Sequence, residues 1–195
     1  MSRQNLSPGR LEAFSDGVIA VIITIMVLEL KVPAQDGMAG LRVVLPTICL
    51  YLLTFVQVGI YWVNHHYLVG EVETVSHGIL WANLIFLFSL SLFPFVTLWI
   101  GTRGLSSFST ALYSAVSLLP GVCYWVLATQ VRKQSTSPPH SSTGKLVSSI
   151  VLYLLAIPVA YYRPWAAMVL IAIVAVLWLL PPKVEDSATL AADKR

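Results

Sequence analysis

Long apolar runs alternate with short polar breaks along most of this chain. Six runs approach or exceed the roughly 20 mostly apolar residues that a helix needs to cross a bilayer; they cover residues 11–30, 41–68, 79–101, 108–131, 146–162 and 165–180. The breaks between them contain turn-forming residues such as Pro33, Gly37 and Pro164. The pattern predicts an all-α membrane protein, with one domain of six transmembrane helices across residues 1–195.

Composition narrows the class further. The chain is 57% hydrophobic and 11% charged, with a mean hydropathy of +0.78, whereas about 25% of the residues in a soluble domain are charged. The basic residues are scattered, which fits membrane flanks better than a nucleic-acid surface. Cys49 and Cys123 lie inside apolar runs and are interpreted as small buried hydrophobes rather than as a disulfide or a metal pair.

The distribution of basic residues predicts an orientation. An even number of spans puts both termini on one side of the membrane, and the sequence assigns that side Arg3, Arg10, Arg132, Lys133, Lys145, Lys183, Lys194 and Arg195. The other side receives Lys31, Arg42, Arg103 and Arg163. Because basic residues are retained on the cytoplasmic side, both termini are predicted to be cytoplasmic.

The first apolar run contains polar residues in unusual places. On a helical wheel, Arg10, Gly17, Val21, Thr24 and Leu28 form one narrow band, with Phe14 and Ile25 at its edge. Asp16 falls about a right angle or more away from that band. The band could be an ordinary packing face on which Thr24 bonds its own backbone, or it could be a functional face. A carboxylate inside a membrane helix needs a partner, which we expect on another helix.

Several short motifs resemble one known family. Arg10 and Phe14-Ser15-Asp16 form the pattern R-x-x-x-F-S-D, and Trp62-Val63-Asn64-His65 is similar to a W-x-x-H motif at the end of a second span. Asn83-Leu84 and Phe93-Pro94-Phe95 resemble motifs of a third span. Together these motifs, which cover about the first 100 residues, resemble the transmembrane protein 175 family, which comprises the lysosomal potassium channel and its prokaryotic relatives.

The resemblance implies a potassium-permeable channel in a bacterial or archaeal cell membrane. It implies a homotetramer in which the first helix of each subunit lines a central pore for monovalent cations, without a cofactor or catalytic residues. The family lacks a T-V-G-Y-G carbonyl filter, and so does this sequence. The resemblance places an apolar constriction at Val21, with Ile25 and Leu28 one and two turns further along, and a pore hydroxyl at Thr24.

Elementary physics is consistent with such a pore. A ring of aliphatic side chains can gate by dewetting, and an ion that passes must shed part of its hydration shell. The signature residues are expected to support the pore rather than to coordinate the ion; they are Arg10, Phe14, Ser15, Asp16, Trp62 and His65. A polar network among these residues, apart from Phe14, would hold the first helix against the second and third.

Two other functions remain open on sequence grounds. A proton- or ion-coupled secondary transporter could use Asp16 and His65 as a titrating pair, and a membrane scaffold could use polar residues only to join helices. No metal site is predicted, because the adjacent His65 and His66 point about 100° apart on a helix and cannot chelate one ion together. A contact of His65 with an inhibitory divalent metal is a minor option.

Overall fold

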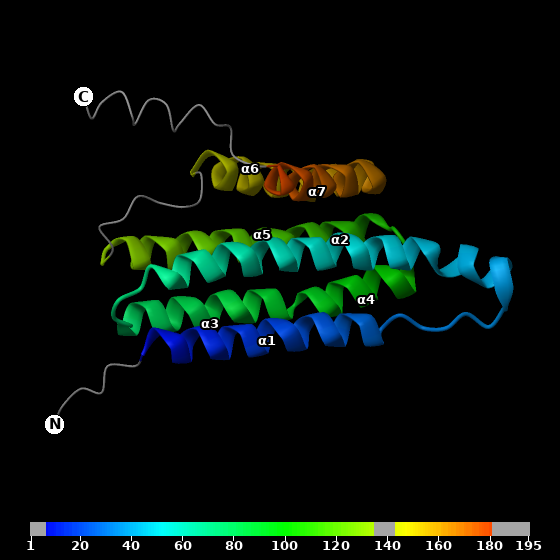
Figure 1. Cartoon of the computed structure of the whole chain (residues 1–195). Helices are drawn as coiled ribbons and strands as arrows, with labels where there is room; N and C mark the ends of the chain where they lie inside the picture. Colours follow the sequence, from blue (N-terminus) through cyan, green and yellow to red (C-terminus); the bar gives the residue numbers. More distant parts are fainter. Residues whose placement is uncertain (1–6, 135–142, 181–195) are drawn as a thin grey trace.

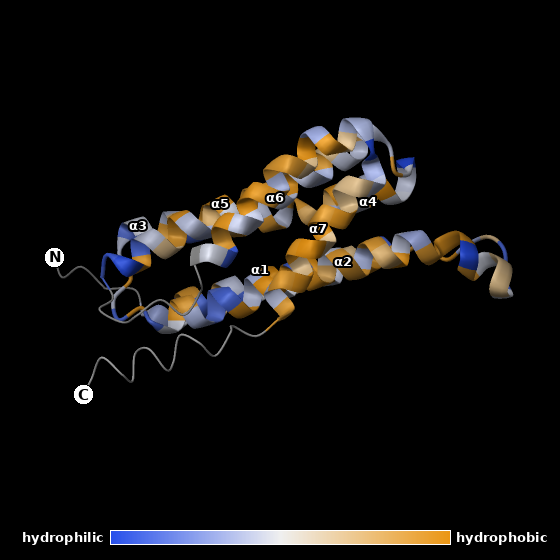
Figure 2. Cartoon of the chain, turned by 90° about the horizontal axis from the view of Figure 1, so that it is seen from above, coloured by the Kyte–Doolittle hydropathy of each residue, from blue (hydrophilic) through white to orange (hydrophobic). Residues whose placement is uncertain are grey.

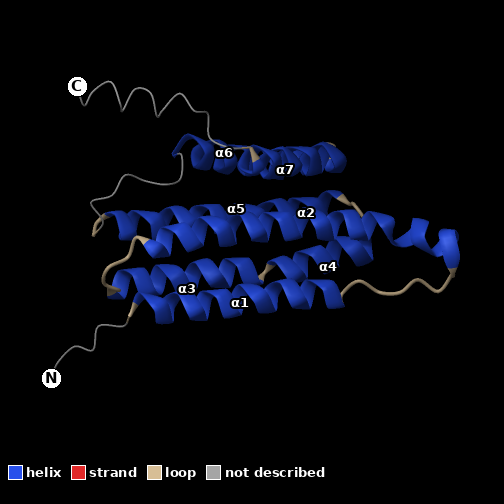
Figure 3. Cartoon of the chain, in the orientation of Figure 1, coloured by secondary structure: helices blue, strands red, loops and turns tan. Residues whose placement is uncertain are grey.

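The computed structural model describes residues 7–134 and 143–180, and every regular element in those ranges is an α-helix (Figures 1 and 3). The helices are α1 (Pro8–Leu28), α2 (Gly37–Gly70), α3 (His77–Ser91), α4 (Phe93–Arg103), α5 (Ser107–Arg132), α6 (Thr143–Tyr162) and α7 (Pro164–Leu179). The all-helical architecture predicted from the apolar runs is therefore confirmed for the described part of the chain.

The predicted spans correspond to these helices, with differences at their ends. Five stretches are long and apolar enough to cross a membrane, the third of them being α3 and α4 together, and α7 is a shorter apolar helix of 16 residues. α2 begins four residues earlier than predicted and has 34 residues, which makes it about 51 Å long at 1.5 Å per residue. Four basic residues used for the orientation lie outside the described residues: Arg3, Lys183, Lys194 and Arg195.

The third span is broken at its centre. α3 ends at Ser91 and α4 begins at Phe93, with Pro94 in the first turn of α4. Proline has no backbone N–H and its ring crowds the preceding turn, so a helix that meets it kinks or restarts. The amide of Val96 reaches back to the carbonyl of Leu92 across the break at 3.2 Å. The two helices consequently remain nearly in line (Figure 1).

The helices run roughly along one common direction. α1 packs against α2, α3 and α4, while α5 packs against α3, α4 and both C-terminal helices, α6 and α7. α1 thus lies on one side of the bundle, with the α6–α7 pair on the opposite side (Figure 1). Hydrophobic residues dominate the middle of the bundle, and hydrophilic residues are more frequent near its ends (Figure 2). This distribution suits a hydrocarbon core bounded by two aqueous interfaces.

A second feature of the interior is a row of hydrogen-bonded polar side chains between α2, α4, α5 and α6. Tyr113 of α5 donates to Gln57 Oε1 at 2.8 Å and lies 2.8 Å from the Thr54 hydroxyl, both on α2. Thr97 of α4 joins at Thr54, and Tyr153 of α6 accepts a hydrogen bond from Gln57 Nε2. Buried polar groups cost free energy unless they are paired. These bonds therefore tie four helices together at defined positions.

Candidate pore-lining helix and its polar contacts

α1 has two faces that differ sharply in exposure. The buried face contains Leu11, Ser15, Ile19, Ile22 and Met26. The predicted constriction residues lie on another face, with Val21 55%, Ile25 42% and Leu28 78% exposed in the single chain. Among the described residues, none of the three side chains of this apolar stripe is buried in the core.

Thr24 lies on the same outward stripe. Its hydroxyl donates to the carbonyl of Val21, three residues earlier on the helix, at 2.9 Å. This is the local bond that a helical threonine commonly makes. The bond uses the hydroxyl proton, so the lone pairs of the oxygen remain available on the exposed side of the helix.

Hydrogen bonds between buried polar side chains join α1, α3 and α2. We call the residues Ser15, Asn83 and His65 the buried relay. Ser15 Oγ donates to the carbonyl of Leu11 at 2.8 Å and accepts from Asn83 Nδ2 at 2.9 Å. Asn83 Oδ1 lies 2.7 Å from His65 Nε2. Ser15, Asn83 and His65 are fully buried. Three helices thus meet at one amide, whose oxygen and nitrogen are both used.

The contact with Asn83 determines the form of His65. An amide oxygen can only accept, so Nε2 carries the imidazole proton in a neutral ring. The other ring nitrogen, Nδ1, is buried and has no hydrogen-bond partner among the described residues. The imidazole is also stacked on Phe86, with ring centroids 5.5 Å apart and planes 5° apart. His65 is therefore held by packing and by a single hydrogen bond.

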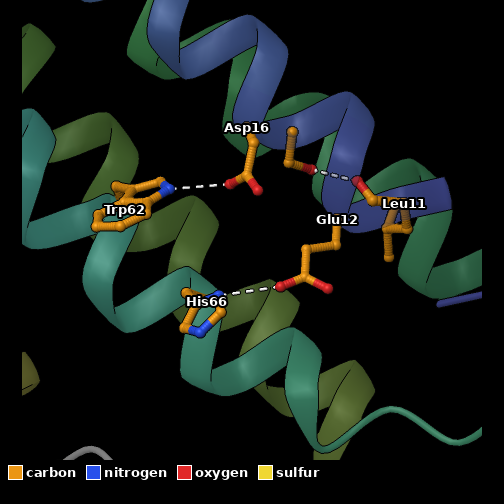
Figure 4. Close-up of polar contacts among 6 residues, drawn as sticks. Leu11, Glu12, Asp16, Trp62 and His66 are labelled. Atoms are coloured by element: carbon orange, nitrogen blue, oxygen red, sulfur yellow. Dashed lines mark hydrogen bonds and ion pairs between the residues drawn. The ribbon is translucent and has the colours of Figure 1, made fainter. Parts of the chain in front are cut away.

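A second set of contacts joins α1 to α2 nearer the surface. Trp62 Nε1 donates to Asp16 Oδ1 at 2.9 Å, and His66 Nδ1 lies 2.9 Å from Glu12 Oε1 (Figure 4). The partners are four residues apart on each helix, so they form two parallel rungs between antiparallel helices. We call these four residues the α1–α2 ladder. Trp62 and His66 also stack, with ring centroids 6.1 Å apart.

The expected single network is thus two separate sets, and two signature residues belong to neither. The Arg10 side chain is exposed and makes no hydrogen bond or ion pair to the described residues. Phe14 is 53% exposed on the outward stripe. Asp16 bonds Trp62 while His65 bonds Asn83. Arg10 therefore does not join Asp16 within the subunit, because it points along the outward face, about 120° around the helix from Asp16.

Sequence reasoning missed three residues of these contacts. Asn83 was noted only as part of a motif, although a lone amide inside an apolar span already indicates a polar partner. Glu12 and His66 received no role. The signal for them was the equal spacing of Glu12–Asp16 and Trp62–His66, since residues four apart share a helix face.

Known proteins resemble this chain over most of its length. The family described as endosomal/lysosomal potassium channel TMEM175 matches residues 10–94, a range that contains the contacts of α1 with α2 and α3 described in this section. A protein named potassium channel from Chryseobacterium sp. (strain P1-3) is 41% identical over 184 residues, which cover 91% of this chain and 95% of that protein. Another potassium channel, from Streptomyces collinus (strain DSM 40733 / Tue 365), is 41% identical over 93 residues, which cover 46% of this chain and 45% of that protein.

A solved structure agrees with the fold. The crystal structure of a lysosomal potassium-selective channel TMEM175 homolog from Chamaesiphon minutus superimposes with a TM-score of 0.72 at 25% identity, covering 88% of this chain and 96% of that one. The similarity therefore includes the C-terminal helices, which the sequence motifs did not reach. Together with the five long apolar helices, these matches show that the chain is a multi-pass membrane protein and a prokaryotic member of the transmembrane protein 175 family.

Proposed function

We propose that this chain is a potassium-permeable cation channel in the cell membrane, assembled as a homotetramer with α1 of each subunit around a central pore. The family and the names of its relatives support the channel function. The observation that carries the proposal for this chain is the exposed stripe of α1. Its apolar side chains, with one hydroxyl among them, are exposed although the opposite side of the same helix is tightly packed.

The narrowest part of this pore is a ring of Val21 side chains, followed by rings of Ile25 and Leu28. Water leaves a narrow aliphatic neck readily, and an ion crosses it only after giving up part of its hydration shell. Potassium gives up water more easily than sodium does, so the neck favours potassium. Thr24 supplies the oxygen atoms nearest to the neck and steadies the partly dehydrated ion.

The two sets of contacts around Ser15 and Asp16 hold the stripe toward the axis. Neither set contains a residue of the stripe, so their role is to position α1 rather than to touch the ion. A carrier that titrates Asp16 together with His65 has weaker support, because each residue has its own partner and the two do not bond to each other. In the proposed channel both termini lie in the cytoplasm, which the distribution of basic residues in the sequence supports.

Recording from purified protein in planar bilayers, with potassium on one side and sodium on the other, tests the pore. We expect Val21→Asn to wet the neck, to raise conductance and to shift the reversal potential toward sodium permeability. Val21→Phe should lower conductance. Thr24→Val keeps the shape of the side chain and removes the hydroxyl, so we expect it to reduce selectivity with little effect on assembly.

Val27→Asn is the matched control. Val27 is also an exposed valine of α1, but it lies about 120° around the helix from Val21. We expect this variant to keep the conductance and the reversal potential of the parent. If the Val21 and Thr24 variants behave like the parent, or if Val27→Asn gives the larger change, ions do not pass along the proposed stripe. Cross-linking in bilayers that yields only monomers or dimers would contradict the tetramer separately.

A further inference from the structure

We propose that the groove between α2, α4 and α7 binds an anionic phospholipid, with one acyl chain in the groove and the phosphate at its arginine-rich end. The groove has a volume of about 660 Å³. Its walls include Pro46, Cys49, Leu53, Ile100, Met168 and Ala172. We call it the α2–α7 groove. It lies apart from the α1 stripe, and this inference does not depend on the channel proposal.

The size and lining of the α2–α7 groove suit a hydrocarbon chain. Its volume falls within the range of about 300–1,000 Å³ that is usual for ligand sites. Apart from the Thr47 hydroxyl and the Cys49 thiol, its lining consists of apolar side chains and glycines. All three helices that form it belong to apolar segments of the membrane protein. An apolar groove inside a bilayer is filled most favourably by the tails of the surrounding lipids.

Two glycines shape the groove at the end of α4. A Cβ atom on Gly101 would lie 3.2 Å from Thr47 Cγ2, so α2 and α4 approach closely at that point. Gly104 ends α4 with a φ of 76°, and a Cβ atom there would meet nothing within 4 Å. The small side chains therefore bring α2 and α4 together at the base of the groove and leave space where α4 ends.

Positive charge gathers at the same end of the bundle. Arg42 lies near the start of α2, Arg103 is the last residue of α4 and Arg163 immediately precedes α7. Figure 1 shows the start of α2, the end of α4 and the junction of α6 and α7 at the same end of the molecule. All three side chains are exposed, and none of them makes an ion pair to a residue in the described ranges. Exposed guanidinium groups at a membrane surface are good ligands for a phosphate.

The charge balance favours an anionic lipid over other occupants. This end of the bundle carries four basic residues, which are the three arginines and Lys31. They stand against two acidic residues, Glu29 and Asp36. A second copy that met this same face in a two-fold contact would place arginine against arginine, whereas a phosphate neutralises the excess. Trp165, exposed in the first turn of α7, is of a type that commonly marks the level of the headgroups.

Cys49 is exposed, so the interpretation of this cysteine as buried was wrong. It is a free cysteine that lines the groove and can therefore report on the test. The full chain is purified in detergent, and the rate of its alkylation by N-ethylmaleimide is followed by peptide mass spectrometry. We expect phosphatidylglycerol at about ten times its Kd to slow the reaction of Cys49 about tenfold. Phosphatidylcholine at the same concentration should slow it much less. Cys123 of α5 lies outside the groove lining, and its rate serves as an internal control for folding.

Three variants locate the site. Arg103→Gln combined with Arg163→Gln should remove the preference for phosphatidylglycerol, whereas Arg132→Gln, at the opposite end of α5, should preserve it. Ala172→Phe fills the groove and should abolish protection by either lipid. Equal protection by both lipids in the parent protein would overturn the anionic headgroup contact. A Cys49 that stays unreactive without added lipid, while Cys123 reacts, would show that another subunit covers the groove and would overturn the proposal.

Discussion

Replacing Asn83 with leucine tests whether the buried relay holds α1 in place. Leucine has nearly the same shape as asparagine but cannot form hydrogen bonds. The substitution removes the 2.9 Å bond to Ser15 and the 2.7 Å bond to His65. Ser15 keeps its bond to the carbonyl of Leu11. His65 keeps no side-chain hydrogen bond, because its Nδ1 atom already has no partner among the described residues.

The expected loss follows from these contacts. Hydrogen bonds between helices inside a membrane contribute on average about 0.6 kcal/mol each, and at most about 1.7 kcal/mol. A buried N–H group that loses its partner costs a further 1–3 kcal/mol or so. Two lost bonds and one orphaned imidazole N–H therefore predict that Asn83→Leu lowers the free energy of unfolding by about 2–4 kcal/mol.

The assay is reversible unfolding of the purified protein in mixed micelles with increasing fractions of sodium dodecyl sulfate, followed by tryptophan fluorescence. Asn64→Leu is the matched control, since within the described ranges the side chain of Asn64 bonds only the carbonyl of Ile60 on its own helix. We expect that control to lose less than about 1 kcal/mol, as usual for a substitution that leaves no buried group unpaired.

A second variant separates the hydrogen bonds from the change in packing. Combining His65→Leu with Asn83→Leu removes both members of the pair, so the double variant should be more stable than the sum of the two single losses predicts, by about 1–2 kcal/mol. Strictly additive losses, or an Asn83→Leu variant no less stable than Asn64→Leu, would refute the view that the relay positions α1.

Two other substitutions test the frame around the candidate pore by the same unfolding measurement. Gly104→Ala should lower the free energy of unfolding by about 1–3 kcal/mol, because a φ of 76° with a ψ of −179° is open to glycine and strained for alanine. Gly70→Ala at the end of α2 is the control and should be close to neutral. Equal effects of the two substitutions would contradict the backbone argument. Tyr113→Phe should cost about 1–3 kcal/mol, since it leaves the carbonyl of Gln57 without its 2.8 Å donor inside the core, while Tyr162→Phe on the exposed end of α6 should change little.

The helical architecture was predictable because its cause is local. A membrane excludes unpaired backbone groups, so each apolar run has to satisfy its own N–H and C=O groups as a helix. The helix ends were less predictable. α2 begins at Gly37, one turn before the predicted start, because Asp36 caps it and accepts a hydrogen bond from the Gly37 amide at 2.7 Å. The break at Pro94 was visible in the sequence as a proline, but whether a proline kinks or divides a helix depends on its neighbours.

The polar contacts were predictable only in part because they depend on packing between helices. The wheel correctly separated Asp16 from the outward stripe, and the motifs named Trp62 and His65. Which partner each residue takes depends on the rotation and depth of three helices at once, and no spacing within one helix contains that information. Asn83 joins Ser15 to His65, but the sequence indicated no role for it beyond its place in a motif.

The order of Ser15 and Asp16 along the chain has a consequence for the stripe. Consecutive residues project about 100° apart on a helix, so Ser15 can point inward to Asn83 only if Asp16 points sideways to Trp62. Glu12 lies one turn from Asp16 and strengthens the same choice through His66. Turning α1 by one residue would withdraw the Ser15 hydroxyl from Asn83 and put Phe14 or Asp16 in its place, depending on the direction of the turn. The two sets of contacts therefore fix the rotation of α1 from two directions, and Val21, Thr24 and Leu28 face outward as a result.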